Sequence, residues 1–340
     1  MSERIPIWGD VIPGNTGADK AERLHIDPAL DGDRALAYVF DPSGHPPCTS
    51  TREFDTAVWH NAILRGRCSA RFDDVPYLTP HVVSGSPICV LLCAGGAYLD
   101  VSTEEEAAPV AEELNRHGIT AFTLSYRFYP YTAPTMFLDC RRALCYLRAH
   151  AADFGFDPGK ICLGGFSAGG NLAAETVHLF REMPEIPNYV PDETDSLDPR
   201  PGALMLAYPK LIFTDTADLL IPLLGDAYFT TDRARAIAHY TVTNHMSAAL
   251  TPPTFLVGSV SDSVVSPENL YAYAMRCLEL GIPCEIHEFL EGGHGFGSAR
   301  SRPYHPFAPP GDYRGLDLWC DLFAIWLRKV FSPPGERTYL

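Results

Sequence analysis

Short apolar runs recur along the chain and alternate with stretches whose apolar residues repeat at helical spacing. Each run is expected to be a buried strand, and the runs cover residues 88–93, 119–124, 160–164, 203–208, 253–258 and 284–289. A final amphipathic helix is predicted over 319–330. Regular alternation of strands and helices predicts an α/β fold, with a mostly parallel, doubly wound sheet flanked by helices.

Two of the predicted helices carry start and stop signals. A capping box over Thr103–Glu106 opens one helix, which Gly118 ends. Ser266 as N-cap and Pro267 at the first helical position open the other, which Gly281 ends. These signals place a helix directly after two of the apolar runs, as the alternating fold requires.

A chain of 340 residues, 46% of them hydrophobic, can bury a sizeable core and is expected to form one domain over residues 1–340. Three segments fall outside the strand–helix pattern. Residues 1–60 are expected to wrap the body, with 57–64 supplying a first antiparallel strand. Residues 210–252 and 298–315 are candidates for a small partial cap over the site, with plain packing against the sheet as the alternative.

The clearest chemical signal is the segment Gly165–Gly169, which follows an apolar run and precedes a helix-forming stretch. Strand, tight turn and helix in this order are typical of a nucleophile elbow, which holds its serine in a strained conformation with the hydroxyl exposed. The turn is so sharp that only small residues fit two positions before and after the serine. Ser167 is therefore the candidate nucleophile.

Two partners for Ser167 follow in loops after later strands. Asp262 comes directly after the 253–258 run, and His294 is framed by glycines after the 284–289 run. The order Ser, Asp, His differs from that of the chymotrypsin and subtilisin types. A histidine would take the serine proton, and an aspartate would orient the imidazole. Asp226 and Asp215 are weaker candidates for the acid.

A loop of small residues follows the 88–93 run and suits the stabilisation of an oxyanion. Backbone N–H groups can converge on a negative charge only where side chains leave room. The candidate donors are the N–H groups of Gly96, Ala97 and Ala168. The candidate substrate contacts are Gly95, Tyr98 and Phe166. Gly95 also shapes the turn.

The motifs resemble those of the α/β-hydrolases, in particular the acetylxylan-esterase and feruloyl-esterase-like group near the acetyl esterase/lipase set. The matching stretches are Cys93–Tyr98, Leu124–Arg127, Gly165–Gly170, Pro252–Val257 and Gly292–Gly297. The chain departs from the group's pattern where Ala94 and Ala97 replace the usual first residue and last glycine of the small-residue loop. Ser261 stands where many relatives carry a second acid.

This resemblance implies an α/β-hydrolase fold and a serine carboxylesterase. Its substrates would be short-chain, acetyl-like esters of a carbohydrate or related small alcohol, cleaved through an acyl-enzyme on Ser167 without a cofactor or metal. An amide hydrolase of the arylformamidase or exopeptidase type is an alternative, because the same machinery cleaves both bonds. A ligand-binding protein that keeps the fold without the chemistry is a further alternative.

The charge balance and the cysteines limit the partners and the cell compartment that the sequence allows. The chain has 26 basic and 42 acidic residues, a net charge of −16, which argues against nucleic acid as a partner. Its ten cysteines lack metal-site spacing, and those on apolar runs and helical stretches read as buried free thiols. With no apolar leader or membrane-length run, we expect a cytoplasmic protein. The sequence leaves a homo-oligomer open.

Overall fold

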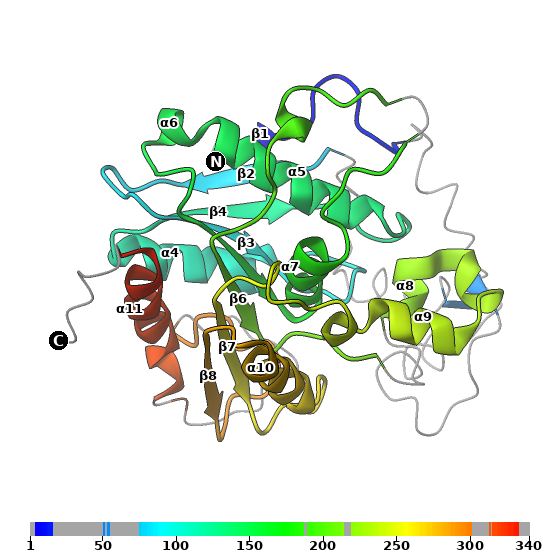
Figure 1. Ribbon diagram of the computed structural model, residues 1–340. Helices are drawn as coiled ribbons and strands as arrows, with labels where there is room; N and C mark the ends of the chain where they lie inside the picture. The colour runs from blue at the N-terminus through cyan, green and yellow to red at the C-terminus, as the bar shows by residue number, and fades with distance from the viewer. Residues whose placement is uncertain are drawn as a thin grey trace.

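One eight-stranded sheet forms the centre of the described chain. The computed structural model describes residues 4–15, 50–51, 53–54, 75–186, 189–213, 219–300, 313 and 315–332. In spatial order the strands are β1 (Ile5–Pro6), β2 (Tyr77–His81), β4 (Thr120–Ser125), β3 (Cys89–Cys93), β5 (Ile161–Phe166), β6 (Ala203–Ala207), β7 (Thr254–Ser259) and β8 (Cys284–Phe289). β3 to β8 pair in parallel, whereas β1–β2 and β2–β4 pair antiparallel, which confirms the predicted mostly parallel sheet (Figure 1).

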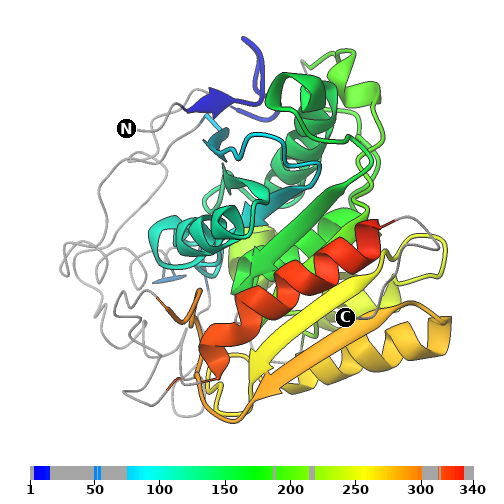
Figure 2. The same cartoon turned by 90° about the vertical axis from the view of Figure 1, so that its left-hand side faces the viewer.

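Helices cover both faces of this sheet. They are η2 (Thr103–Ala107), α4 (Ala108–Arg116), α5 (Thr135–Ala149), α6 (Ala151–Phe154), α7 (Ser167–His178), η3 (Thr194–Ser196), α8 (Leu220–Leu224), η4 (Gly225–Phe229), α9 (Arg233–Tyr240), η5 (Val242–Asn244), α10 (Glu268–Leu280), η6 (Leu316–Leu318) and α11 (Trp319–Phe331). α4 and α11 pack on one face, and α5, α7 and α10 on the other (Figure 2). None of these helices is long and apolar enough to cross a bilayer.

Burial on both faces explains why the strands read as continuous apolar runs. In β3, Cys89, Leu91 and Cys93 point into the core beneath α5 and α7, whereas Val90 and Leu92 point into the core beneath α4 and α11. All five side chains are fully buried. A strand that is covered on both sides has no polar face, so its sequence loses the alternation of a half-exposed strand.

Most of the cysteines that the structure describes lie in this core as free thiols. Those that the structure describes are Cys89, Cys93, Cys140, Cys145, Cys162, Cys277, Cys284 and Cys320, and all but Cys284 are buried. Burial raises the pKa of the Cys162 thiol above its ordinary value, which keeps it protonated and unreactive. The prediction of buried free thiols on strands and helices is confirmed for the buried cysteines among these residues.

Two predicted helix starts are wrong in detail. The Thr103–Glu106 capping box does not form, because these residues belong to the π-helix η2 and Glu106 turns inward to accept the N–H of Gly95. The N–H of Thr103 bonds to the carbonyl of Val101 instead. α10 begins at Glu268, with Pro267 as N-cap, one residue later than predicted. Its predicted end at Gly281 is confirmed by a left-handed C-cap.

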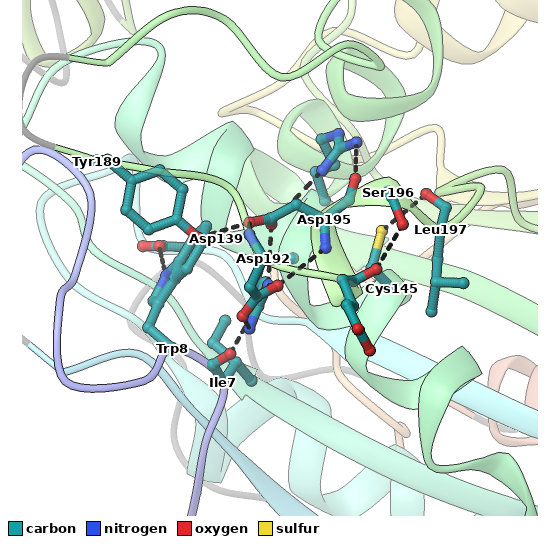
Figure 3. A network of polar contacts seen from close by, with 12 residues as sticks. Ile7, Trp8, Asp139, Cys145, Tyr189, Asp192, Asp195, Ser196 and Leu197 are labelled. Carbon is teal, nitrogen blue, oxygen red and sulfur yellow. Dashed lines mark hydrogen bonds and ion pairs between the residues drawn. The ribbon is translucent and has the colours of Figure 1, made fainter.

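A buried polar network joins the N-terminal segment and the 189–197 loop to α5 (Figure 3). Trp8 donates its indole N–H to Asp139 at 2.7 Å, and Arg142 donates to the carbonyl of Ile7 at 2.8 Å. The guanidinium of Arg142 also pairs with Asp192 and Asp195. Residues 4–15 are thus packed against the body, while the predicted strand over 57–64 lies outside the described residues.

The two predicted cap segments differ in how much the structure describes. Within 210–252 the chain forms α8, η4, α9 and η5, and α8 and α9 lie beyond the end of the sheet in Figure 1. Leu220, Ile221 and Leu223 are buried in α8. Most of 298–315 lies outside the described residues, so its place at the site stays a prediction.

Candidate active site

The turn between β5 and α7 has the strained geometry that the sequence predicts. Ser167 has a φ of 51°, a left-handed conformation that a residue with a Cβ rarely adopts. A Cβ added to Gly165 would lie 2.1 Å from the carbonyl oxygen of Gly169. One added to Gly169 would lie 2.1 Å from the carbonyl oxygen of Cys93. The steric requirement for both glycines is confirmed.

Ser167, His294 and Asp262 come from three separate loops and form one continuous hydrogen-bond chain. Nε2 of His294 lies 2.8 Å from Oγ of Ser167, and Nδ1 lies 2.7 Å from Oδ2 of Asp262. His294 is 4% exposed and Asp262 is 9% exposed. Asp226 is exposed on η4, where it accepts a hydrogen bond from Thr51, and Asp215 lies outside the described residues. The geometry therefore selects Asp262 over Asp226 as the partner of the histidine.

Backbone contacts fix the carboxylate of Asp262. Its Oδ1 accepts the N–H groups of Val264 and Val265, both at 2.9 Å, which leaves Oδ2 directed at the imidazole. Ser261, at the position where the resemblance suggests a second acid, accepts the N–H of Gly293 at 3.1 Å. This hydrogen bond ties the aspartate loop to the histidine loop, by which we mean residues 292–297.

The 94–98 loop, which follows β3, packs against the elbow. A Cβ added to Gly95 would lie 2.8 Å from Cβ of Ser167, so only glycine fits beside the serine. Gly96, Ala97 and Tyr98 follow with φ values of 128°, 56° and 57°. The N–H groups of Gly96 and Ala97 donate no hydrogen bond to any residue that the structure describes. These two N–H groups are thus available to a ligand.

Tyr98 and Phe166, the two aromatic candidates for substrate contact, have fully buried side chains. The hydroxyl of Tyr98 donates to Oδ1 of Asn171 at 2.7 Å, and its ring packs edge-on to Tyr126. The ring of Phe166 packs edge-on to Trp319 on the opposite face of the sheet. Both side chains hold the elbow in the core, and nothing in their surroundings supports a role as substrate contacts.

Two further carboxyl groups lie close to the catalytic candidates His294 and Asp262. Glu106 is 2% exposed, and burial raises its pKa to about 7. The hydrogen bond from Gly95, the contact with Tyr208 and the charge of His294 oppose this shift. Burial also raises the pKa of Glu288 on β8 to about 7, and the charge of Asp262 adds to this shift. Near neutral pH the site therefore holds less negative charge than its count of acids suggests.

Chemically, this arrangement can activate a hydroxyl. A neutral imidazole that accepts from Ser167 can take its proton, and the buried carboxylate of Asp262 stabilises the imidazolium that forms. Because no metal-binding group of His, Cys, Asp and Glu side chains occurs among the described residues, no metal can be assigned to this part of the chain.

Comparison with known proteins agrees with this geometry. A family model described as alpha/beta hydrolase fold matches residues 90–298, more than half of the chain. The chain belongs to the alpha/beta hydrolase fold family. The matched range contains Ser167, Asp262 and His294 together with the 94–98 loop.

Three similar proteins place the chain more closely. A crystal structure of an acetyl ester-xyloside bifunctional hydrolase from Caldicellulosiruptor lactoaceticus superposes with a TM-score of 0.66 at 26% identity, covering 97% of this chain and 96% of that one. Endo-1,4-beta-xylanase B of Butyrivibrio fibrisolvens is 29% identical over 84% of this chain and 45% of its own length. Acetylxylan esterase of Xylanibacter ruminicola is 26% identical over 71% of this chain and 45% of its own. The chain thus spans about half the length of these curated relatives.

Glu106 and Tyr208 lie at the site of this hydrolase but were missed as site residues. The sequence did contain a signal for Glu106, because it precedes the buried Val110 and Leu114 by four and eight residues, on the apolar face of the helical segment. A carboxylate on such a face needs a buried partner. Tyr208 carries no comparable signal, since it directly follows the apolar strand β6, where an aromatic residue is common.

Proposed function

We propose that this alpha/beta hydrolase is a serine carboxylic ester hydrolase that cleaves short-chain, acetyl-like esters of a carbohydrate or related small alcohol. The observation that carries the proposal is the continuous chain of hydrogen bonds from Ser167 through His294 to Asp262, with distances of 2.8 and 2.7 Å. It lies on a strained elbow beside a loop with two free backbone N–H groups.

Acylation begins when Oγ of Ser167 attacks the ester carbonyl carbon. His294 takes the serine proton through Nε2 as the new C–O bond forms, and Asp262 stabilises the imidazolium. The carbonyl oxygen becomes an oxyanion, for which the N–H groups of Gly96, Ala97 and Ala168 are the proposed donors. The tetrahedral intermediate then collapses, the ester C–O bond breaks, and His294 returns the proton to the leaving alcohol.

Deacylation repeats the same steps with water as the nucleophile. His294 takes a proton from water as its oxygen adds to the acyl carbon. The second tetrahedral intermediate breaks the bond to Oγ of Ser167, and the proton returns to the serine. The products are a carboxylic acid and the free enzyme, so the cycle needs no cofactor or metal.

The substrate class rests on similarity. The structure of the acetyl ester-xyloside bifunctional hydrolase matches nearly the whole chain, and the Xylanibacter relative is named an acetylxylan esterase. An acetyl ester on a sugar hydroxyl is the substrate class that both names share.

The test is a series of p-nitrophenyl esters from acetate to octanoate, together with acetylated xylo-oligosaccharides. Ser167→Ala removes the nucleophile, and Ser196→Ala, an exposed serine on η3, is the matched control. We expect Ser167-dependent turnover that favours acetate and releases acetate from the oligosaccharide. Mass spectrometry after rapid quenching should find an acetyl group on the peptide that contains Ser167.

Other outcomes separate the alternatives. Fast cleavage of butyrate or longer esters with the oligosaccharide untouched would retain the esterase and discard the carbohydrate. Turnover of aryl formamides or peptide amides without ester cleavage would indicate the amide hydrolase. Tight ligand binding with no acyl-enzyme on Ser167 would indicate a binding protein and refute the proposal.

A further inference from the structure

Glu106 is a buried carboxyl group that belongs to neither the hydrogen-bond chain of Ser167 nor the 94–98 loop. It comes from η2, and one of its oxygens accepts the N–H of Gly95. Tyr208, directly after β6, lies beside the same carboxyl group, and the two side chains shift each other's pKa. One side chain therefore contacts both the 94–98 loop and the loop that follows β6.

The histidine loop joins this arrangement through Tyr208. The hydroxyl of Tyr208 accepts the N–H of Gly297 at 3.2 Å, and its ring lies edge-on to His294 with centroids 5.0 Å apart. Gly297 also packs on η2, since a Cβ added there would lie 2.4 Å from the carbonyl oxygen of Glu105. The hydrogen bond from Gly95 to Glu106, the contact between Glu106 and Tyr208, and the hydrogen bond from Gly297 to Tyr208 thus link the 94–98 loop to the histidine loop.

These contacts suit an ionised carboxyl group. A carboxylate only accepts, so it can receive both the N–H of Gly95 and the O–H of Tyr208. The Tyr208 oxygen is then left to accept from Gly297. A protonated carboxyl or an amide at position 106 would keep one oxygen for the N–H of Gly95 and present a hydrogen to Tyr208, whose own hydroxyl hydrogen would then have to turn away from residue 106.

We propose that Glu106 is a positioning residue, whose ionised carboxylate holds the 94–98 loop and the histidine loop in register with Ser167. This inference rests on the proposed function, because it assigns the loops their roles in ester cleavage. The strained backbone of Ala97 and Tyr98 persists only if surrounding contacts over-determine it. The hydrogen bond from Gly95 to Glu106 is one such contact, and it leaves the next two N–H groups free.

The charges around Glu106 make this arrangement sensitive to pH. Burial raises the pKa of Glu106 to about 7, the charge of Glu105 adds to the shift, and the charge of His294 opposes it. Tyr126, at the end of β4, is another titratable neighbour that senses the charge of Glu106. The ionised form of Glu106 is therefore lost as pH falls through about 7, and this loss contributes to the acid limb of activity.

The test compares Glu106→Gln with the wild type on p-nitrophenyl acetate from pH 5 to 9. Glu104→Gln makes the same charge change at an exposed position of η2 and is the matched control. Glutamine keeps the size of the side chain, so a role in packing alone predicts no change. We expect kcat to fall by about 10²-fold at pH 8, as for a displacement of about 1 Å in the catalytic groups, with KM little changed.

Two further readouts distinguish positioning from structural support. The acid limb of kcat should move to lower pH in Glu106→Gln, because the group that titrates near pH 7 is gone. Tyr208→Phe should also lower kcat. The double variant of Glu106→Gln and Tyr208→Phe should be no worse than the more damaging single variant, because both changes interrupt the same link between the two loops. Thermal melting and stoichiometric phosphonate labelling of Ser167 establish that each variant is folded.

The outcomes are separable. An active, Ser167-dependent wild type with Glu106→Gln unchanged in kcat and pH profile would overturn this inference and leave the proposed function intact. A folded Glu106→Gln with a raised KM and an unmoved acid limb would likewise overturn it. A wild type without Ser167-dependent turnover on any ester would remove the proposed function and this inference with it.

Discussion

Replacing Asp262 with asparagine tests the catalytic chain with the smallest change in shape. In the protein, Oδ1 of Asp262 accepts two backbone N–H groups, those of Val264 and Val265, and Oδ2 faces Nδ1 of His294. The asparagine will keep its oxygen on the two N–H groups and turn its amide nitrogen toward the imidazole. Nδ1 must then accept, so Nε2 carries the proton and cannot take one from Ser167.

The cost of restoring the active tautomer can be worked out from these contacts. Turning the amide over would leave the N–H groups of Val264 and Val265 without their acceptor, at about 1–3 kcal/mol each. The total of about 2–6 kcal/mol corresponds to roughly a 30-fold to 10⁴-fold loss of active tautomer. Loss of the charge that stabilises the imidazolium adds to this, so we expect kcat/KM to fall by about 10⁴-fold.

The assay is kcat/KM on p-nitrophenyl acetate, with phosphonate titration of Ser167 to count competent sites. Asp226→Asn, at an exposed position on η4, is the matched control and should remain within about twofold of the wild type. An Asp262→Asn variant that retains a third or more of wild-type activity would refute the reasoning. So would a larger loss in the control than in Asp262→Asn.

Three predictions concern stability, each measured by urea unfolding. Gly169→Ala should lower the free energy of unfolding by about 3 kcal/mol, because its Cβ would lie 2.1 Å from the carbonyl oxygen of Cys93; an unchanged midpoint would contradict this. Asp139→Asn should cost about 3–5 kcal/mol, since it removes the carboxylate charge that pairs with the fully buried guanidinium of Arg127, whereas Asp153→Asn at an exposed position of α6 should cost little. Burial lowers the pKa of His178 from 6.5 to about 3, so stability present above pH 6.5 is lost as pH falls toward 3. His178→Gln should make the drop between pH 7 and pH 5 smaller by about 2 kcal/mol, and an equal drop in both proteins would exclude His178 as its source.

Much of this site could be predicted because its constraints are local. The glycines at 165 and 169 are required by a turn of a few residues, and a histidine framed by glycines cannot lie on a regular element. Strands β3 to β7 were equally clear, since burial on both faces of the sheet removes every polar residue from a run such as β3, whereas β1 and β2 were not predicted. The small residues of a tight turn and the apolar runs of buried strands can both be recognised directly in a sequence.

The parts that escaped prediction depend on contacts between distant segments. The capping box at Thr103 is a sound local pattern, but the N–H of Gly95 offers Glu106 a buried partner that the local cap does not. Tyr98 looked like a ligand contact because it ends a small-residue loop. Its burial follows from Asn171 on α7, more than seventy residues away, which supplies a partner for its hydroxyl.

The left-handed residues of the site bear on how this protein responds to selection. All five non-glycine residues with positive φ in the described chain lie in loops around Ser167: Ala97, Tyr98, Ser167, Tyr208 and Ala299. Each stores about 1 kcal/mol or more of strain. Glycine would release this strain at Ala97 and Ser167, whose side chains are small, whereas at Tyr98 and Tyr208 the loss of a buried aromatic side chain would outweigh it. A library screened for heat resistance alone would therefore accumulate glycine at Ala97 and Ser167 and remove the proposed nucleophile. Thermostabilisation of this protein needs a selection that also requires turnover, because stability and the proposed activity compete at the same backbone angles.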